Sequence, residues 1–477
     1  MHWLAIHLPK LPLEVYPGAL ASSLPLAVGL DPGGEPILLC NASAQGRGVR
    51  PGLAAGAARA LAADLRILLR RPEAERAALE RLAAWCIRFT PQVSLAPPAG
   101  LVLDVAASLR LFGGGEAIRA AVETGVMGLG YGCTCCLAPT PGGALILAEQ
   151  GQGGVIAGRA ALRSALAALP VSALDLDRRG RDDLAAMGLR RLADLLRLPR
   201  AGLAARLGPG LVRQLGRLLG DEPDPRPAFA PPDGYAGQLE LPAEVPDAGG
   251  LVFACRRLVE ELCGYLLGRQ AGVQRLEWRL SHADLPDTAF VLGASTPGRD
   301  PAVWLALLRE RLGRLTLPAP VRALTLMARD VRPLLPGPLD LLPELAQTIA
   351  PDSGLLDRLR ARLGEGAVRG LQALPDHRPE RAWRWCLPGE AGLWQGRADR
   401  PLWLLPEPRP LDVRGQRPWY GGPLDLGTER ERIETGWWDG LEVARDYFVA
   451  TTDGGARLWI YRDRHGRRGW FLHGVFG

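Results

Sequence analysis

Cysteine, histidine and carboxylate side chains often carry chemistry, and this chain has one tight group of cysteines. Residues 132–136 read Gly-Cys-Thr-Cys-Cys, which places Cys133, Cys135 and Cys136 close together. Thiolates could bind zinc there, but a structural zinc site needs a second Cys or His pair at suitable spacing, and none follows. On a strand, Cys133 and Cys135 would share one face. We interpret the group as buried reduced thiols and predict no metal site and no cofactor.

Arginine is the second residue type with chemical potential, because its guanidinium group binds phosphate. Lys and Arg together number 57, with Lys10 as the sole lysine, and the formal net charge is +6. This balance permits binding to a polyanion such as DNA without requiring it. Our candidates for phosphate contacts lie in two stretches, a leucine-rich helical one and a predicted strand. They are Arg197, Arg200, Arg206, Arg213, Arg275 and Arg279.

The first four arginines belong to a helical stretch from about residue 166 to 220. Its leucines recur with helical spacing, and Gly188 and Gly208 fall in the connections. A helix, a short glycine-containing hairpin and a second helix can offer backbone N–H groups to a DNA phosphate. An ordinary small helical bundle with a solvated arginine face would show the same pattern. Both interpretations stand.

Arg275 and Arg279 belong to a later α+β stretch. Along residues 272–282, Leu276, Trp278 and Leu280 alternate with these arginines, so one strand face is apolar and the other basic. Such a face could lie along a phosphate backbone. The surrounding pattern predicts a βαββαβ domain with strands at 236–242, 272–282, 287–294 and 320–331 and helices at 249–267 and 301–314.

The rest of the chain divides by composition. Residues before the helical stretch mix short buried strands with helices, and nine of the 13 Trp lie beyond residue 380, in a stretch with a hairpin predicted to turn at His465-Gly466. Those tryptophans could form a core or a binding surface, and the sequence leaves both open. We predict an α+β domain (1–165), a helical domain (166–226), a Pro-rich linker (227–235), the βαββαβ domain (236–331), a second linker with a helix (332–379) and a mostly β module (380–477).

Length and hydropathy exclude several protein classes. At about 150 residues per domain, 477 residues predict roughly three domains. Gly 59 and Pro 42 recur without a period, which excludes collagen. Apolar runs are interrupted well before the roughly 20 residues of a membrane span, and we find no signal sequence. We expect a cytoplasmic protein that contacts no membrane.

This order of domains resembles the Y-family translesion DNA polymerases, with palm and fingers, thumb and little finger. Four segments carry the resemblance, which covers about residues 1 to 335. They are WLAIHLPKLPLEVY, CNASAQGRGVRPG, QVSLAPPAGLVLDV and LAPTPGGALILAEQG. The resemblance implies a multidomain α+β fold: a Y-family-like palm and fingers, a helix-hairpin-helix-like thumb, a βαββαβ little finger and a Trp-rich, mostly β C-terminal module.

The catalytic positions of that family are degenerate here. Active members bind two Mg²⁺ ions through carboxylates, because this hard cation requires oxygen ligands. The resemblance places those carboxylates at His7, Ala99 and Gly100. Asp104 follows, but one carboxylate cannot hold two metals, and strand parity points it away from position 99. A structural role at the start of the next helix is the better interpretation.

The positions that would contact the nucleotide triphosphate have also changed. The resemblance places them at Ala42, Gln45 and Glu149, and only Asn41 keeps its expected type. Glu149 puts an acid where a basic residue would meet phosphates. We therefore predict a chain that is shaped like a polymerase but is not an enzyme.

A Y-family-like chain with these losses resembles the ImuB family, the non-catalytic component of bacterial mutagenesis cassettes. The segments RIETGWWDG, ARDYFVA, LWIYRD and GWFLHGVFG extend this resemblance to the end of the chain. It implies an adaptor in damage-induced translesion synthesis. Such an adaptor would bind damaged or primed DNA and the sliding clamp, and would recruit an error-prone C-family DNA polymerase and a RecA-like, ImuA-type protein.

A degenerate clamp-binding peptide accompanies the resemblance. Clamp-binding peptides resemble Gln-Leu-(Ser/Asp)-Leu-Phe, and three of the five positions match at Pro338, Leu339, Asp340, Leu341 and Leu342. A leucine-rich linker would look similar. Two further alternatives stand: an active polymerase with relocated ligands such as Asp104 and Glu14, and an interaction module that no longer touches DNA.

Overall fold

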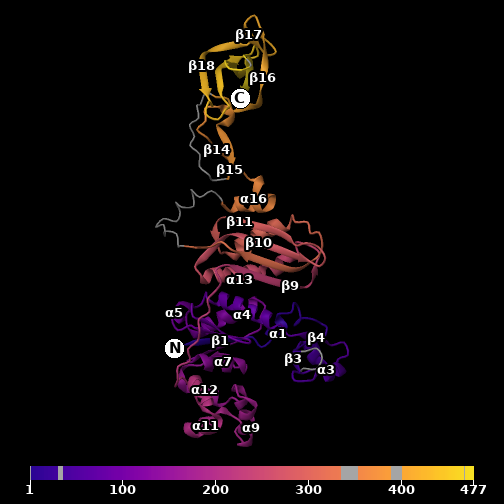
Figure 1. The fold of residues 1–477 in the computed structure, drawn as a ribbon, viewed down its shortest axis with the longest axis vertical. Helices are drawn as coiled ribbons and strands as arrows, with labels where there is room; N and C mark the ends of the chain where they lie inside the picture. Colours follow the sequence, from indigo (N-terminus) through magenta and orange to yellow (C-terminus); the bar gives the residue numbers. More distant parts are fainter. Residues whose placement is uncertain (1, 31–35, 335–352, 388–399, 467) are drawn as a thin grey trace. The chain divides into compact units, whose positions relative to one another are not determined.

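The computed structural model describes residues 2–30, 36–334, 353–387, 400–466 and 468–477 (Figure 1). Contacts divide the chain into two compact units, residues 1–362 and 363–477, and each is described by itself. We use palm, fingers, thumb and little finger as labels for the parts of the first unit.

The palm is a five-stranded sheet with strand order β5-β6-β1-β7-β8. The central strand β1 (Trp3–His7) is antiparallel to β6 (Gly100–Asp104) and to β7 (Thr134–Ala138). The outer strands are β5 (Val93–Ala96) and β8 (Gly154–Val155). The inner strands read as almost continuous apolar runs because helices cover both faces of the sheet.

Alternate residues of β1 divide between the two covered faces. Leu4 and Ile6 pack against α4 and α6, whereas Ala5 packs against α7 on the opposite face. His7 has the same parity as Ala5 and therefore points to the α7 face. The helices of the palm are α4 (Pro72–Cys86), α5 (Leu109–Phe112), α6 (Gly115–Gly128) and α7 (Pro141–Glu149).

The fingers are a small sheet of three strands in the order β3-β2-β4, with its own apolar core. Its elements are α1 (Leu11–Glu14), β2 (Leu26–Gly29), β3 (Ile37–Cys40), α2 (Ala42–Gly46), α3 (Ala55–Leu61) and β4 (Arg66–Leu69).

The thumb is helical, as predicted. Leu184, Leu192 and Leu195 are buried, and the connections use Gly188 and Gly208 with positive φ angles of 72° and 85°. Such angles favour glycine and separate the helices. Its elements are α8 (Gly158–Ala167), the 3-10 turn η1 (Val171–Ala173), α9 (Arg178–Ala186), α10 (Leu192–Leu196), α11 (Arg200–Leu207) and α12 (Pro209–Leu219).

The little finger confirms the predicted βαββαβ order. Its sheet has the order β11-β10-β12-β9, with the short β13 paired to β10, and two long helices cover one face. Its elements are β9 (Tyr235–Val245), α13 (Leu251–Gly268), β10 (Ala271–His282), β11 (Thr288–Gly298), α14 (Pro301–Leu312), β12 (Val321–Ala328) and β13 (Val331–Pro333), followed by α16 (Ser353–Leu363).

The second unit is mostly β. A six-stranded antiparallel sheet has the order β17-β16-β21-β20-β19-β18, and a two-stranded sheet precedes it. The predicted hairpin at His465-Gly466 is confirmed by the pairing of β20 with β21. Its elements are η2 (Glu365–Ala367), β14 (Gly370–Ala373), η3 (Pro379–Arg381), β15 (Trp383–Cys386), β16 (Trp403–Arg414), β17 (Arg417–Trp419), β18 (Asp425–Thr435), β19 (Val443–Thr451), β20 (Arg457–Asp463) and β21 (Trp470–Val475).

The predicted fold class is confirmed: the chain is a multidomain α+β protein with a helical thumb, a βαββαβ little finger and a β-rich C-terminal module. Within the described ranges, no helix has both the length and the apolar content that crossing a bilayer requires.

Candidate functional site

The three residues that the resemblance places at catalytic positions meet at one end of the palm sheet. His7 is directly opposite Gly100 in the β1–β6 ladder and opposite Thr134 in the β1–β7 ladder. The neighbouring Ala99 uses its carbonyl oxygen to accept the Leu8 N–H at 2.8 Å. His7, Ala99 and Gly100, which the sequence analysis assigned separately, therefore lie side by side in the sheet.

His7 has the character of a neutral, partly buried imidazole. Its Nδ1 atom is buried without a hydrogen-bond partner in the part of the chain described, and burial lowers its pKa below the ordinary value. A neutral imidazole neither attracts Mg²⁺ strongly nor replaces a carboxylate, because this cation prefers oxygen ligands.

Gly100 leaves no room for a longer side chain. A Cβ atom added to it would lie 2.9 Å from the backbone oxygen of Ala96 and 3.0 Å from Cδ1 of Leu145. Leu145 reaches this point because α7 packs across β1 and β6. An apolar side chain thus lies against the position where a metal-binding carboxylate would begin. The residues present do not fit a Mg²⁺ ion at this site.

The remaining carboxylates of the palm lie elsewhere. Asp104 is opposite Trp3 at the far end of the β1–β6 ladder, four residues or about 13 Å from Gly100. Its Oδ1 accepts the Ala106 N–H at 3.1 Å and so supports the turn after the strand, which agrees with the structural role we predicted.

Glu14 lies beyond the other end of β1, in α1, and accepts the Gly132 N–H at 2.7 Å. Burial raises its pKa, opposed by that hydrogen bond and by Lys10 and Arg257. The structure therefore does not bring Glu14 and Asp104 together.

The finger residues that the resemblance places at nucleotide-binding positions lie on and beside α2. Ala42 and Gln45 are exposed on α2, and Gln45 donates its side-chain amide to the Cys40 oxygen at 3.2 Å. Asn41 is buried, and its side chain caps α2 by accepting the Ala44 N–H at 3.0 Å. Its amide also donates to three backbone oxygens between residues 19 and 24. The side-chain oxygen and nitrogen of Asn41 are both used in holding the fingers together.

Glu149 lies at the end of α7 and lines a cleft between the palm and the thumb. The cleft has a volume of about 520 Å³, and Arg213, Arg217 and Arg226 line it as well. Sequence reasoning did not predict that Glu149 and the DNA-contact candidate Arg213 would share one cleft. Arg217 and Arg226 were not candidates, because arginine is too frequent in this chain for its position to signal a role.

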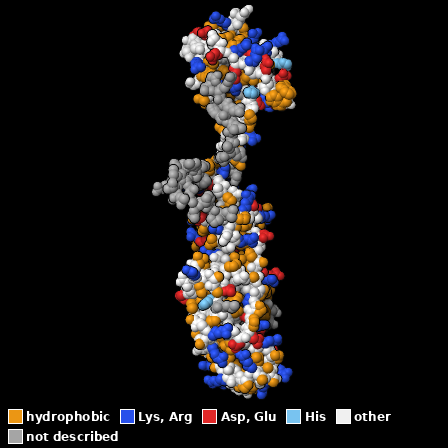
Figure 2. All heavy atoms as spheres, turned by 90° about the vertical axis from the view of Figure 1, so that its left-hand side faces the viewer, with side chains coloured by type: hydrophobic (Ala, Val, Ile, Leu, Met, Phe, Trp, Pro, Cys, Tyr) orange, Lys and Arg blue, Asp and Glu red, His pale blue; other side chains and the backbone are white. Residues whose placement is uncertain are grey.

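The four thumb candidates are all exposed. Arg197, Arg206 and Arg213 are solvent-facing, and Arg200 makes an ion pair with Asp221. Figure 2 shows Lys and Arg side chains gathered over the thumb, at the lower end of that view. The thumb therefore presents a basic surface, as a DNA-phosphate contact requires.

Arg275 and Arg279 of the little finger alternate as predicted. Both are exposed on the outer face of β10, whereas Leu276, Trp278 and Leu280 are fully buried against α13 and α14. On the same outer face, Glu277 lies between them and approaches Arg329 at 3.7 Å.

The structure does not bring the thumb and little-finger arginines to one surface. Several packed layers separate the two groups. From the little-finger sheet toward the thumb, these layers are α13, α4, the palm sheet and α7 (Figure 1). Successive layers are about 10 Å apart, so five such steps place the two groups of arginines on the order of 50 Å apart. In this arrangement one short stretch of duplex cannot contact both.

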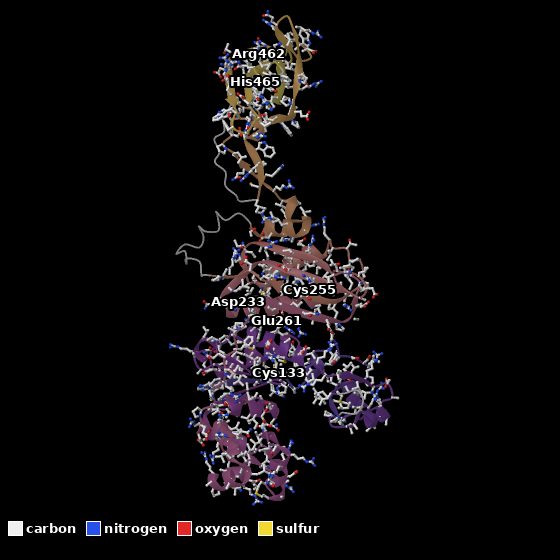
Figure 3. All side chains as sticks on the ribbon, viewed as in Figure 1. Cys133, Asp233, Cys255, Glu261, Arg462 and His465 are labelled. Atoms are coloured by element: carbon white, nitrogen blue, oxygen red, sulfur yellow. The ribbon has the colours of Figure 1, made fainter. Side chains whose placement is uncertain are left out.

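A close interface between α4 and α13 holds the little finger in this place. Trp85 of α4 lies in a notch between two glycines: a Cβ atom at Gly264 would come within 2.0 Å of its ring, and one at Gly125 within 2.2 Å. Glu261 of α13, labelled in Figure 3, is buried and forms an ion pair with Arg81 of α4 at 3.1 Å. Burial raises the pKa of Glu261, opposed by the charges of Arg81 and Arg257.

The same interface encloses a cleft of about 630 Å³ that sequence reasoning missed. Its walls come from the chain after α1, from α4, from β9 and from α13. Arg71 pairs with Glu240 across it at 3.4 Å, and Arg257 stacks over the Tyr131 ring at 4.8 Å. No sequence motif marks these residues, because their proximity depends on how two separate domains pack.

The eight cysteines are free thiols. Cys133 and Cys135 approach each other to 3.9 Å between sulfur atoms, and Cys133 is only half buried, which corrects part of the prediction that the group is buried. Among the residues that the structure describes, no three His, Cys, Asp or Glu side chains form a group that could hold a metal ion.

The tryptophans of the second unit divide between core and surface. Trp459 is buried, whereas Trp383, Trp385, Trp403, Trp437 and Trp438 are exposed. Trp437 and Trp438 meet edge to face with ring centroids 5.5 Å apart. The predicted clamp-binding residues, Pro338 to Leu342, lie outside the described residues.

Comparisons with known proteins identify the family of this chain. Residues 16–149 match the model of the impB/mucB/samB family. The chain is 31% identical over 472 residues to Protein ImuB of Caulobacter vibrioides strain NA1000 / CB15N, an alignment that covers 90% of this chain and 100% of that protein. The chain belongs to the ImuB family. Protein ImuB of a second Caulobacter vibrioides strain, ATCC 19089, gives the same values of 31%, 90% and 100%.

Solved structures similar to this ImuB-family chain are Y-family DNA polymerases. A chimera of the polymerases Dbh and Dpo4 is 18% identical, covers 69% of this chain and 99% of its own, and has a TM-score of 0.42. DinB from Sulfolobus solfataricus is 18% identical, covers 70% of this chain and 100% of its own, and has a TM-score of 0.40.

Proposed function

We propose that this chain is a non-catalytic, Y-family polymerase-like adaptor for damage-induced translesion synthesis in the cytoplasm. It would bind primer-template DNA through the palm and the thumb, and would dock on the sliding clamp. Its C-terminal module would recruit an error-prone C-family DNA polymerase and a RecA-like, ImuA-type partner. Membership of the ImuB family and the polymerase-like order of its domains support this proposal.

The observation that carries the proposal is the closed end of the palm sheet. His7 and Gly100 face each other where metal-binding carboxylates would be, and Leu145 lies against Gly100. An active polymerase with relocated ligands finds less support, because Asp104 and Glu14 lie at opposite ends of β1. Without two metal ions the triphosphate has no counter-charge and the primer hydroxyl is not activated.

Primer extension tests the non-catalytic part. The purified chain should add no nucleotide to primed DNA with Mg²⁺ or Mn²⁺. The triple variant His7→Asp, Ala99→Asp, Gly100→Glu should also remain inactive, because Leu145 and the Ala96 oxygen obstruct the new side chain. Incorporation by the unaltered chain that a palm substitution abolishes would overturn the proposal. Incorporation by the triple variant alone would show that the site is open.

DNA binding tests the adaptor part and separates it from an interaction module without DNA. The variant Arg206→Ala, Arg213→Ala should bind primed duplex DNA several-fold more weakly. The slope of log affinity against log salt should fall by about 1.8, because two phosphate contacts are lost. The matched control removes two other exposed arginines, Arg110 and Arg178, from outside the candidate set. Salt-independent or undetectable binding by the unaltered chain would favour the interaction module.

The clamp contact remains a proposal for residues 338–342. Replacing Leu341 and Leu342 with alanine should reduce retention of the chain on immobilised sliding clamp about tenfold, since apolar anchors carry most of such peptide affinity. DNA affinity should not change. Leu345→Ala, in the same leucine-rich stretch but outside the five residues, is the control. Equal retention of both variants would locate the contact elsewhere.

A further inference from the structure

An arginine cluster occupies one end of the six-stranded sheet in the second unit. Asp446 on β19 is opposite Arg432 on β18 and opposite Arg462 on β20. Arg432 donates to Asp446 at 2.7 Å, and Arg430 and Arg464 each approach it to 3.9 Å. One largely buried carboxylate thus orders several arginines around it.

The cluster keeps a clear excess of positive charge. Among the described residues, Asp446 and Glu434 form ion pairs with these arginines, and Glu434 accepts from Arg464 at 3.0 Å. A third carboxylate, Asp463, lies beside them and accepts the His465 N–H at 3.1 Å. The exposed arginines outnumber these three carboxylates; they are Arg430, Arg432, Arg462, Arg464 and Arg468. Burial alone would raise the pKa of Asp446, but the hydrogen bond from Arg432 and the nearby arginine charges hold it below its usual range. The carboxylate therefore stays ionised and holds the arginines at neutral pH.

A pair of exposed tryptophans lies at the same end of the sheet. The tryptophan loop (436–442) joins β18 to β19, and the described residues 464–466, 468 and 469 lie between β20 and β21. The backbone N–H of Arg464 donates to the Ala444 oxygen at 2.9 Å, so the two connections are neighbours. Trp437 and Trp438 on the loop are 76% and 59% exposed. Figure 2 shows basic side chains gathered on this unit, and Figure 3 labels Arg462 and His465 on the hairpin.

The tryptophan loop is held in a defined conformation. Arg378, itself 3% exposed, donates to both carboxylate oxygens of Asp439 at 3.0 and 2.8 Å and to the Leu441 oxygen at 3.2 Å. These bonds anchor the loop at its far side. Two large aromatic rings are therefore presented to solvent without a large loss of loop entropy on binding.

We propose that this end of the C-terminal sheet binds single-stranded nucleic acid. The ordered arginines would contact successive phosphates, and Trp437 and Trp438 would stack on unpaired bases. Aromatic side chains beside a basic surface are the combination that binds single strands, because every base offers a face for stacking. A duplex offers phosphates but no free base faces. An acidic protein surface would satisfy the arginines but would leave the tryptophan pair without a matching contact.

The test is fluorescence anisotropy of the full chain with oligo(dT) of about 20 nucleotides. The variant Arg462→Ala, Arg468→Ala should bind about tenfold more weakly, and its salt slope should fall by about 1.4 for the two phosphates lost. The control variant Arg457→Ala, Arg384→Ala removes the same charge from the other end of β20 and from β15. It should bind like the unaltered chain. Equal weakening by both variants would overturn the proposal.

A second pair of variants keeps the proposal testable if the arginine variant folds poorly. Trp437→Ala, Trp438→Ala removes only exposed side chains and should weaken oligo(dT) binding at least about tenfold. Trp383→Ala, Trp385→Ala removes the other exposed edge-to-face pair, with centroids 5.4 Å apart, and should not. If Trp437→Ala, Trp438→Ala binds oligo(dT) as the unaltered chain does, the proposed single-strand site is wrong. This conclusion holds whether or not the variant also loses a protein partner.

The site is distinguishable from the DNA contacts proposed for the thumb. Each variant is also measured on primed duplex DNA, where the C-terminal substitutions should have little effect. If the thumb substitutions leave duplex binding unchanged, the proposed function is contradicted and this inference stands. If only the C-terminal substitutions are without effect, on oligo(dT) binding, this inference is contradicted and the proposed function stands.

Discussion

Replacing Gly264 with leucine should detach the little finger from the palm. A Cβ atom at this position would come within 2.0 Å of Trp85 Cδ1, and the remaining leucine atoms have no space between α13 and α4. The other edge of Trp85 packs so closely on Gly125 of α6 that a Cβ atom added there would come within 2.2 Å of the ring, so Trp85 has little room to move aside. Overpacking of a closed interface usually costs about 1–3 kcal/mol, and this overlap should reach the upper end of that range.

The measurement is the radius of gyration in solution, together with the rate of chymotrypsin cleavage after Phe229 in the Pro-rich linker (227–235). Both should increase in the variant, because the Phe229 side chain packs against the cores of both domains and is partly buried only while they remain together. Gly202→Leu is the matched control: it makes the same change in helix α11, where nothing lies within 4 Å of the added Cβ atom. An unchanged radius and an unchanged cleavage rate would show that α4 and α13 do not pack in this way.

Detachment has a consequence for the proposed DNA contacts. While α13 lies on α4, Arg275 and Arg279 are several layers from the thumb arginines. Freed from the palm, the little-finger sheet could reach the same duplex. The Gly264→Leu variant should then bind primed DNA more tightly, with a salt slope that is steeper by about 1.8. An unchanged slope would indicate that the outer face of the sheet does not contact the duplex.

The sequence predicted those parts of the fold that depend on local pattern. The alternation of Arg275, Leu276, Trp278, Arg279 and Leu280 was sufficient to assign both faces of β10, because a strand repeats every two residues. The thumb connections at Gly188 and Gly208 followed from glycine alone, and both have positive φ.

The candidate site needed tertiary information. The resemblance placed His7 and Gly100 at degenerate positions, but the sequence did not predict their pairing or the obstruction by Leu145. Both depend on how β1 pairs with β6 and on where α7 crosses the sheet. The interface at Trp85 joins residues from α4, α6 and α13 that are far apart in sequence. Glycine notches of this kind carry no local signature, since glycine is also frequent in the turns of this chain.

The sequence also could not predict which of the C-terminal tryptophans are buried. Composition could not decide between core and surface, because tryptophan is common in both. The structure assigns Trp459 to a core with Tyr447, Tyr461 and Phe471 and leaves Trp437 and Trp438 exposed. Trp459 lies within β20, between two paired strands, whereas Trp437 and Trp438 lie in a connection. A place in a strand is not sufficient for burial, because Trp403 begins β16 and is exposed.

This division predicts unequal effects of two alanine substitutions. Trp459→Ala should lower the unfolding free energy of the second unit by about 4 kcal/mol, because a buried indole is lost and a cavity remains. The ring is 3% exposed and stacks on Tyr447 with centroids 4.0 Å apart, so both burial and an aromatic contact disappear. Trp403→Ala, at a side chain that is 75% exposed, should change the stability by less than about 0.5 kcal/mol.

Amide hydrogen exchange of β19, β20 and β21 measures this difference within the full chain. A single melting temperature would not, because a chain with two compact units does not unfold in one step. Exchange in these strands should accelerate strongly in Trp459→Ala and remain unchanged in Trp403→Ala. Equal protection in both variants would mean that Trp459 is not part of the core. If protection falls only in Trp459→Ala, Trp403 has no role in folding, and its exposed apolar surface is available to a binding partner.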